Sequence, residues 1–144
     1  MAKRRNNRQD AIRDIVREKD VRTQRMLVEE LKACGFDCTQ ATVSRDIADM
    51  GLKKLPEGVY VLAEDLHLQR MVADLVVGVD RTGNLLVVKG REGTASGVAA
   101  AIDSANLPDV LGSIAGTDTI LVVTRTEADG ERLEAMLNRL RAAR

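Results

Sequence analysis

The chain is predicted to fold as an α+β protein with two domains, and three observations lead to this prediction. Residues 1–62 contain three short apolar segments at helical spacing, whereas residues 71–144 alternate between strand-like and helix-like segments. A length of 144 residues is enough for two small domains. The charge is divided as well, because residues 1–62 carry thirteen basic and ten acidic side chains and residues 63–144 carry nine and twelve. Residues 63–70 are expected to form a linker between the domains, or a short helix that continues into the second.

A first helix is predicted close to the start of the sequence. Ile12, Ile15 and Val16 have the i, i+3, i+4 spacing of one helix face, and residues 1–7 before them are expected to form a disordered basic arm. Residues 1–25 hold nine Lys or Arg but only four Asp or Glu. This local excess of positive charge favours contact with the phosphates of a nucleic acid over an ordinary solvated surface.

Two further helices are predicted around a tight turn. Thr23 and Thr39 are placed to cap their first turns, and Gly35 and Gly51 are placed to end them, because glycine readily accepts the left-handed conformation. The buried positions are expected to be apolar residues at helical spacing: Met26, Leu27 and Leu31 in the second helix, and Val43, Ile47 and Met50 in the third. Residues 52–62 then read as two short strands around a Pro/Gly turn. Three helices followed by a hairpin predict a winged helix-turn-helix domain over residues 1–62.

The outward face of the third predicted helix has the chemistry of a helix that lies in the major groove of DNA. Its short polar side chains and one arginine can hydrogen-bond base edges and phosphates. The lysines of the wing are expected to face backbone phosphates. Six residues are therefore expected to contact DNA: Gln40, Thr42, Ser44, Arg45, Lys53 and Lys54. The alternatives are an intrahelical ion pair between Arg45 and Asp49 and a simply solvated wing.

The second domain, residues 71–144, is predicted to be a small α+β domain with a mostly antiparallel sheet and two helices. Four strands are expected, over residues 75–80, 85–89, 110–115 and 119–124. The first helix is expected to be capped by Thr94, and the second to start near Glu127. Their inner faces are expected to be Val98, Ala101, Ile102 and Ala105, and then Leu133, Met136, Leu137 and Leu140. A domain this small is expected to gain stability by forming oligomers.

The composition argues against several other classes of protein. Cys34, Cys38 and the single histidine, His67, cannot supply four ligands for a zinc ion, so no metal site is expected. No nucleophile–base pair and no phosphate-binding glycine loop is visible, so the chain is not expected to be an enzyme. No signal peptide is expected, because the first residues are charged rather than apolar, and no apolar run approaches the roughly 20 residues of a membrane span. A cytoplasmic location is therefore expected, with no membrane partner.

Two motifs resemble segments of the bacterial arginine repressors. Residues 40–46, Gln-Ala-Thr-Val-Ser-Arg-Asp, resemble their SQATVSRD segment, and residues 112–119, Gly-Ser-Ile-Ala-Gly-Thr-Asp-Thr, resemble their GTIAGDDT segment. The order of elements also agrees, so the resemblance covers nearly the whole chain. It implies a sequence-specific transcription regulator of arginine-metabolism genes that binds double-stranded operator DNA. It also implies L-arginine as corepressor and a homo-hexamer built as a dimer of trimers.

The resemblance further implies five ligand-binding residues, three in or beside the second motif and two that match family positions in the helix before it: Ala115, Thr117 and Asp118, and Ser96 and Asp103. Thr117 departs from the family pattern, which has an aspartate there. A neutral hydroxyl cannot accept both N–H groups of a guanidinium fork, and losing one charge-assisted hydrogen bond typically costs about 1.5–3 kcal/mol. The expectation is weaker arginine binding or a different ligand.

Two alternatives to an arginine-dependent regulator follow from this departure and from the second domain. The first is an arginine-insensitive or differently liganded paralogue that acts as an architectural DNA-binding protein, which the neutral side chain of Thr117 favours. The second is an amino-acid-sensing subunit of an enzyme, which only the small α+β domain suggests. The basic, winged first domain argues against the second alternative.

Overall fold

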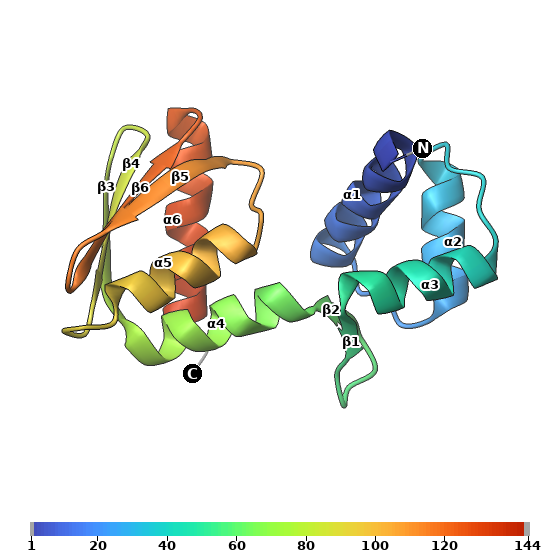
Figure 1. Cartoon of the computed structure of the whole chain (residues 1–144), viewed down its shortest axis with the longest axis horizontal. Coiled ribbons are helices and arrows are strands. Elements are labelled where there is room, and N and C mark those ends of the chain that lie inside the picture. Colours follow the sequence, from blue (N-terminus) through green and yellow to red (C-terminus); the bar gives the residue numbers. More distant parts are fainter. Residues whose placement is uncertain (1, 143–144) are drawn as a thin grey trace. The chain divides into compact units, whose positions relative to one another are not determined.

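The computed structural model describes residues 2–142, with side chains from residue 7 onward, and it divides into two compact units (Figure 1). The N-terminal unit ends at Ala63 and the C-terminal unit begins at Glu64. Each unit has a hydrophobic core of its own, made almost entirely of aliphatic side chains.

The N-terminal unit contains three helices and a two-stranded antiparallel sheet. Its elements are α1 (Ala2–Glu18), α2 (Gln24–Ala33), α3 (Gln40–Met50), β1 (Leu52–Lys54) and β2 (Tyr60–Leu62). In the sheet, Leu52 pairs with Leu62 and Lys54 pairs with Tyr60. The order of helices followed by a hairpin confirms the predicted winged helix-turn-helix.

The ends of α2 and α3 follow the predicted chemistry. The hydroxyls of Thr23 and Thr39 each accept a backbone N–H from the first turn of their helix. Gly35 and Gly51 adopt φ angles of 91° and 68°, in the left-handed region that lets each helix stop. The prediction of Met26 as a buried residue is wrong, because its side chain is 38% exposed. Helix α2 packs against the core through Leu27 and Leu31 instead.

The predicted disordered arm is also wrong over residues 2–7, because α1 begins at Ala2. This segment contains no glycine or proline that would break a helix. One turn further on, Arg8 and Gln9 hydrogen-bond to Asp46 of α3, which fixes this part of α1 against its neighbour. The basic side chains at positions 3–5, from which phosphate contacts were predicted, are not among the side chains that the structure describes.

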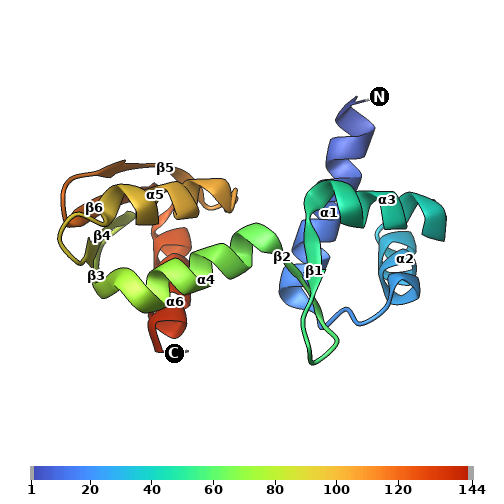
Figure 2. The same cartoon turned by 60° about the horizontal axis from the view of Figure 1, so that its bottom comes forward.

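The C-terminal unit is a four-stranded antiparallel sheet with its helices on one face (Figures 1 and 2). Its elements are α4 (Ala63–Leu75), β3 (Val76–Thr82), β4 (Leu85–Gly90), α5 (Ala95–Ser104), β5 (Val110–Ala115), β6 (Thr119–Thr124) and α6 (Glu127–Ala142). The strand order is β3-β4-β6-β5, which leaves β3 and β5 at the edges. The core joins the inner sheet residues Leu86, Val88, Ile120 and Val122 to the predicted apolar faces of α5 and α6.

The segment assigned as a linker, residues 63–70, is instead the first part of α4. The reason is an apolar stripe at i, i+3, i+4, i+7 spacing: Leu68, Met71, Val72 and Leu75. Leu68 and Val72 are almost fully buried in the core of the C-terminal unit. The C-terminal unit therefore has a third helix in addition to the two predicted. Of the two possibilities given for residues 63–70, a linker or a helix continuing into the second domain, the structure shows the helix.

The predicted side-chain cap at the start of α5 is not formed. Thr94 occupies the capping position, but its hydroxyl donates to the carbonyl of Arg91 over 2.6 Å. The first amide of the helix, that of Ala95, donates instead to the carbonyl of Thr117 over 3.3 Å. The start of α5 is thus attached to the loop between β5 and β6.

A close backbone contact between α6 and the β3–β4 turn gives a stability prediction. A Cβ atom added at Gly130 would lie 2.9 Å from the carbonyl oxygen of Gly83. Gly130→Ala is expected to lower the free energy of unfolding by about 1–3 kcal/mol, because backbone must move to make room. This exceeds the roughly 0.5–1 kcal/mol that alanine gains over glycine in a helix. Urea unfolding followed by circular dichroism measures the change.

Gly78→Ala is the matched control, because no atom lies within 4 Å of the added Cβ and the backbone is extended there. It is expected to leave the free energy of unfolding unchanged or to raise it by less than about 1 kcal/mol. Equal stabilities of the two variants would contradict this account of the contact between α6 and the hairpin.

Candidate nucleic-acid interface and ligand site

Helix α3 buries one face and exposes the other. Val43 and Asp46 are buried in the N-terminal unit. Gln40, Ser44 and Arg45 are exposed. Arg45 takes part in no hydrogen bond or ion pair with the described residues. The intrahelical ion pair between Arg45 and Asp49, considered above as an alternative, is therefore not formed. Gln40, Ser44 and Arg45 therefore form a polar surface of the helix with which no other described residue makes a side-chain hydrogen bond or ion pair.

Thr42 contributes to this surface less freely than its neighbours. It is half-buried, and its hydroxyl lies 3.0 Å from the hydroxyl of Thr39, the residue that caps the helix. A hydroxyl has a second lone pair and a rotatable proton, so one further hydrogen bond stays available to it. Its side chain is part of the N-terminal end of α3, the end that enters the major groove in helix-turn-helix proteins.

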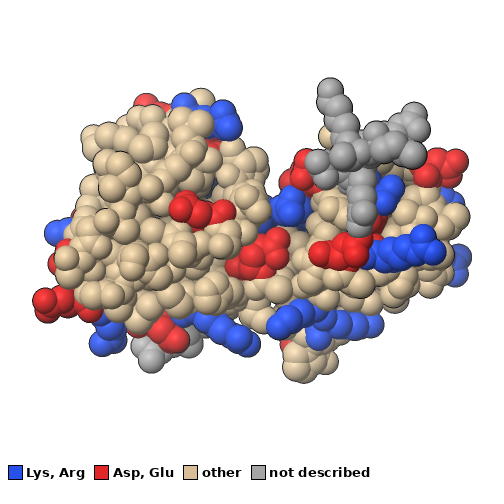
Figure 3. Space-filling view, in the orientation of Figure 1, with Lys and Arg blue, Asp and Glu red and all other residues tan. Residues whose placement is uncertain are grey.

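The wing exposes Lys53 and Lys54 on β1. The Nζ of Lys54 lies 5.4 Å from the centroid of the Tyr60 ring, a cation–π contact at the strand pair next to the turn of the wing. The wing is also fixed to the connection between α1 and α2. The amide of Tyr60 donates to the carbonyl of Val21, and Nη1 of Arg22 donates to the carbonyl of Glu57, each over 2.8 Å. In Figure 3, basic side chains lie along the lower edge of the N-terminal unit, where Figure 1 places the wing.

Sequence reasoning missed the most buried acid among the described residues, Asp46, which is 1% exposed. Its carboxylate accepts hydrogen bonds from Arg8 over 2.5 and 3.1 Å and from Gln9 over 3.3 Å. The hydrogen bond to Asp46 raises the pKa of the Arg8 guanidinium. A signal was present in the sequence, because Asp46 stands at the i+3 position after Val43 on the apolar stripe of α3. A carboxylate on a buried stripe requires a partner.

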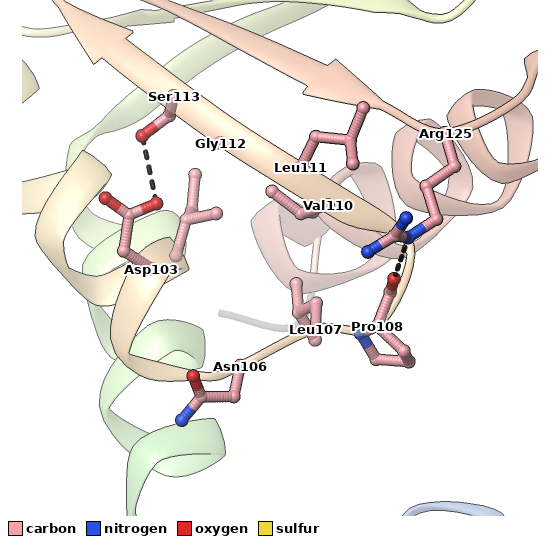
Figure 4. Close-up of a pocket in the computed structure, with 10 residues that line it drawn as sticks. Asp103, Asn106, Leu107, Pro108, Val110, Leu111, Gly112, Ser113 and Arg125 are labelled. Atoms are coloured by element: carbon pink, nitrogen blue, oxygen red, sulfur yellow. Dashed lines mark hydrogen bonds between the residues drawn. The ribbon is translucent and has the colours of Figure 1, made fainter.

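The C-terminal unit contains a pocket of about 510 Å³ between the end of α5 and the first part of β5 (Figure 4). The pocket is lined by Ile102, Asp103, Asn106, Leu107, Pro108, Val110, Leu111, Gly112, Ser113 and Arg125. On one side, the hydroxyl of Ser113 donates to the carboxylate of Asp103 over 3.0 Å. On the opposite side lies Arg125, whose Nε donates to the carbonyl of Pro108 over 3.1 Å (Figure 4). The pocket thus offers an anionic and a cationic group at its two ends.

Only one of the five residues implied as ligand-binding, Asp103, lines this pocket. The others lie toward the other end of α5 and β5: Ser96, Ala115, Thr117 and Asp118. There the carbonyl of Thr117 accepts the amides of Gly93 and Ala95, and the carbonyl of Asp118 accepts the amide of Gly90 over 2.7 Å. These backbone bonds hold the β5–β6 loop beside the start of α5. Ser113 and Arg125 are pocket residues that the motif comparison did not assign.

The side chains along α5 and β5 are mainly acceptors. Asp103 and Asp118 carry exposed carboxylates, and Ser96 and Thr117 carry exposed hydroxyls. Such groups suit a ligand with several N–H donors. Because β5 is an edge strand, this side of the sheet is not covered by another strand of the described chain.

Other kinds of site have less support. In residues 7–142, no group of three or more His, Cys, Asp or Glu side chains is placed to hold a metal ion. Cys34 is exposed and Cys38 is buried, both as free thiols. Burial raises the pKa of Cys38. Of the helices described, none has the length and apolar character needed to cross a membrane.

A capped helix with an exposed polar face, next to a basic hairpin that is hydrogen-bonded to its own unit, defines a winged helix-turn-helix DNA-binding protein with a second, α+β domain. Comparisons with known proteins narrow this class. Residues 3–68 match the family model "Arginine repressor, DNA binding domain", and residues 72–139 match "Arginine repressor, C-terminal domain". The chain belongs to the arginine repressor family.

Several curated relatives share most of their length with the chain. An arginine repressor of Thermus thermophilus is 49% identical, over 88% of this chain and 84% of that protein. The arginine repressor of Carboxydothermus hydrogenoformans is 44% identical, over 92% and 93%. That of Shouchella clausii is 40% identical, over 90% and 94%. These matches confirm the resemblance that the two motifs indicated.

The exposed side chain of Arg45 gives a prediction for DNA binding. Arg45→Ala is expected to abolish the preference for a specific duplex over a random one, because a base contact worth about 1–3 kcal/mol is lost at each half-site. The specific duplex is the one that the wild-type protein selects from a randomised pool. Fluorescence anisotropy titrations with both duplexes measure the preference.

Arg25→Ala is the control, because Arg25 is highly exposed on α2 and its ion pair is with Glu29 of the same helix. It is expected to leave the preference intact. The assignment of Arg45 fails if its removal weakens binding to both duplexes equally.

Proposed function

We propose that the chain is a cytoplasmic transcription regulator that represses genes of arginine metabolism, with L-arginine as its corepressor. The observation that carries this proposal is the exposed polar face of α3, with Arg45 unpaired among the described residues, in a chain of this family. The residues proposed to contact operator DNA are Gln40, Thr42, Ser44 and Arg45 on α3, with Lys53 and Lys54 on the wing. The ligand is proposed to bind along α5 and β5.

The proposed mechanism is thermodynamic linkage between the ligand and the operator. A ligand that binds better to the subunit arrangement that matches the operator also raises the operator affinity of the protein, by the same factor. The reciprocal holds as well, so operator DNA should raise the affinity for the ligand. This mechanism needs an assembly of subunits whose arrangement can change.

The outer face of the sheet supports assembly into a homo-oligomer, which we propose to be a hexamer built as a dimer of trimers. The strand register places Ile114 opposite Leu121 and Leu121 opposite Val87, in one row on the face away from the helices. Ile114 is 74% exposed and Leu121 is 37% exposed. No described element of the C-terminal unit covers this row. Apolar side chains gathered on an open sheet face favour contact with another subunit.

Thr117 favours a second candidate function, that of an arginine-insensitive or differently liganded DNA-binding protein. Its side chain is exposed and makes no hydrogen bond with the described residues, whereas its carbonyl holds the start of α5. Position 117 therefore offers a hydroxyl where a carboxylate would bind a guanidinium much more strongly. Because only the backbone of Thr117 is used, the side chain can be exchanged without disturbing the loop.

Thr117→Asp tests the ligand part of the proposal. Adding the carboxylate is expected to raise the affinity for L-arginine by about ten- to hundredfold, the equivalent of one charge-assisted hydrogen bond. Calorimetric titration of wild type and variant with L-arginine, citrulline, ornithine and lysine measures the affinities. Sedimentation velocity over a dilution series, with and without arginine, is expected to show stronger arginine-dependent assembly of the variant.

Thr117→Asn is the matched control, because asparagine has the shape of aspartate without its charge. It is expected to bind L-arginine about as weakly as the wild type. If the wild type binds L-arginine tightly and Thr117→Asp does not change the affinity, another group takes the role of the missing carboxylate. Operator binding that no tested amino acid alters would decide for the architectural alternative.

A further inference from the structure

Three hydrogen bonds join α1 to α3 at one buried carboxylate. The Nε of Arg8 donates to Oδ2 of Asp46 over 2.5 Å, and Nη2 of Arg8 donates to Oδ1 over 3.1 Å. The Nε2 of Gln9 donates to Oδ1 over 3.3 Å. The side chain of Asp46 is 2% exposed, whereas that of Arg8 is 22% exposed. A guanidinium that holds a carboxylate with two bonds fixes the direction of the contact as well as its distance.

The position of Asp46 in the sequence couples this contact to the exposed face of α3. Asp46 directly follows Ser44 and Arg45, and successive residues of a helix point about 100° apart. Any rotation of α3 that moves Asp46 away from Arg8 therefore turns Ser44 and Arg45 by the same angle. The apolar residues of the stripe, the buried Val43 and the partly buried Ile47 and Met50, make hydrophobic contacts, which have no preferred direction. Burial of these apolar residues selects which face of α3 turns inward, and the ion pair adds a directional restraint on the rotation of the helix about its axis.

The charge of Arg8 is already compensated inside the protein. Its guanidinium faces a buried carboxylate, whereas Lys53 on the wing carries an exposed charge with no partner among the described residues. A side chain that neutralises a phosphate adds to the slope of log affinity against log salt concentration, because counterions are released. A side chain whose charge stays on an internal carboxylate does not.

The geometry points to Arg8 as a positioning residue for operator recognition: through Asp46 it sets the rotation of α3 about its axis, and with it the direction of Ser44 and Arg45. This inference rests on the proposed function, because it presupposes that α3 reads DNA. Arg8 itself contacts neither base nor phosphate in this account. It acts on the specificity of binding and leaves the electrostatic attraction to DNA unchanged.

The test replaces the ion pair by an apolar pair in the full-length protein, as Arg8→Met/Asp46→Leu. Removing both charges avoids the uncompensated buried carboxylate that Arg8→Met alone would leave, so the double variant is expected to fold. Its matched control is Lys19→Met/Glu30→Leu, which removes the Lys19–Glu30 ion pair of 2.7 Å, an exposed contact that does not involve α3. Both double variants have the net charge of the wild type.

Affinities are measured by anisotropy for the duplex that the wild type selects from a randomised pool and for a random duplex, over a range of salt concentrations. The Arg8 and Asp46 double variant is expected to lose at least about tenfold in the ratio of the two affinities, with an unchanged salt slope. The control is expected to keep both the ratio and the slope. Arg8→Lys, which keeps the charge but cannot form the two-bond fork, is expected to lower the ratio too.

Several results would overturn the inference. If the double variant folds and keeps the wild-type ratio of affinities for the two duplexes, the ion pair has only a structural role. Circular dichroism with urea unfolding shows whether the variant folds. A failure of the double variant to fold leaves Arg8→Lys to decide, and a wild-type ratio in that variant would refute positioning. An equal loss in the control would show a general effect of removing an ion pair. If the wild type itself shows no preference for any duplex, the proposed function fails and this inference falls with it.

Discussion

The burial of one face of α3 is the constraint on which the N-terminal unit depends. Val43 must pack against the aliphatic core, while Asp46 on the same face must find a cation. The first requirement selects the face of the helix that turns inward. The second ties α3 to α1 at one defined point. Both together leave Ser44 and Arg45 on the outside, so the surface proposed to contact DNA is a consequence of what the helix buries.

The wing is held by a different kind of interaction. A backbone hydrogen bond from the Tyr60 amide to the Val21 carbonyl attaches the small hairpin to the segment between α1 and α2. Two strands of three residues each would have little stability alone. Attachment to this segment, and the contact of Lys54 with the Tyr60 ring, allow a short hairpin to keep its lysines in place.

In the C-terminal unit, backbone hydrogen bonds position the β5–β6 loop, whereas a side-chain ion pair positions α3 in the N-terminal unit. The carbonyl of Thr117 accepts the amides of Gly93 and Ala95, which binds the β5–β6 loop to the start of α5. The loop conformation therefore does not require a particular side chain at position 117. The side chain at position 117 can therefore change the chemistry offered to a ligand while the loop and the start of α5 keep their positions. Small residues serve the same framework elsewhere, as where Gly130 of α6 approaches the turn at Gly83.

Local patterns in the sequence by themselves determined the type and order of most elements. Thr23, Thr39 and Gly51 act within one helical turn of their own positions, and the apolar spacing of α5 and α6 needs no knowledge of the partner surface. The polar face of α3 followed from the same periodicity. These features were predictable because the interactions behind them join residues close in sequence. The family followed from two motifs, which depend on residue identity alone.

Tertiary structure decided what depends on contacts between distant segments. The packing of α4 and the partner of Asp46 both depend on surfaces formed by other parts of the chain. The division of the implied ligand residues is of the same kind. Asp103 faces Ser113 in a pocket, while Thr117 lies toward the other end of α5. Sequence spacing cannot place them, because the path of β5 beside α5 is set by the packing of the whole sheet.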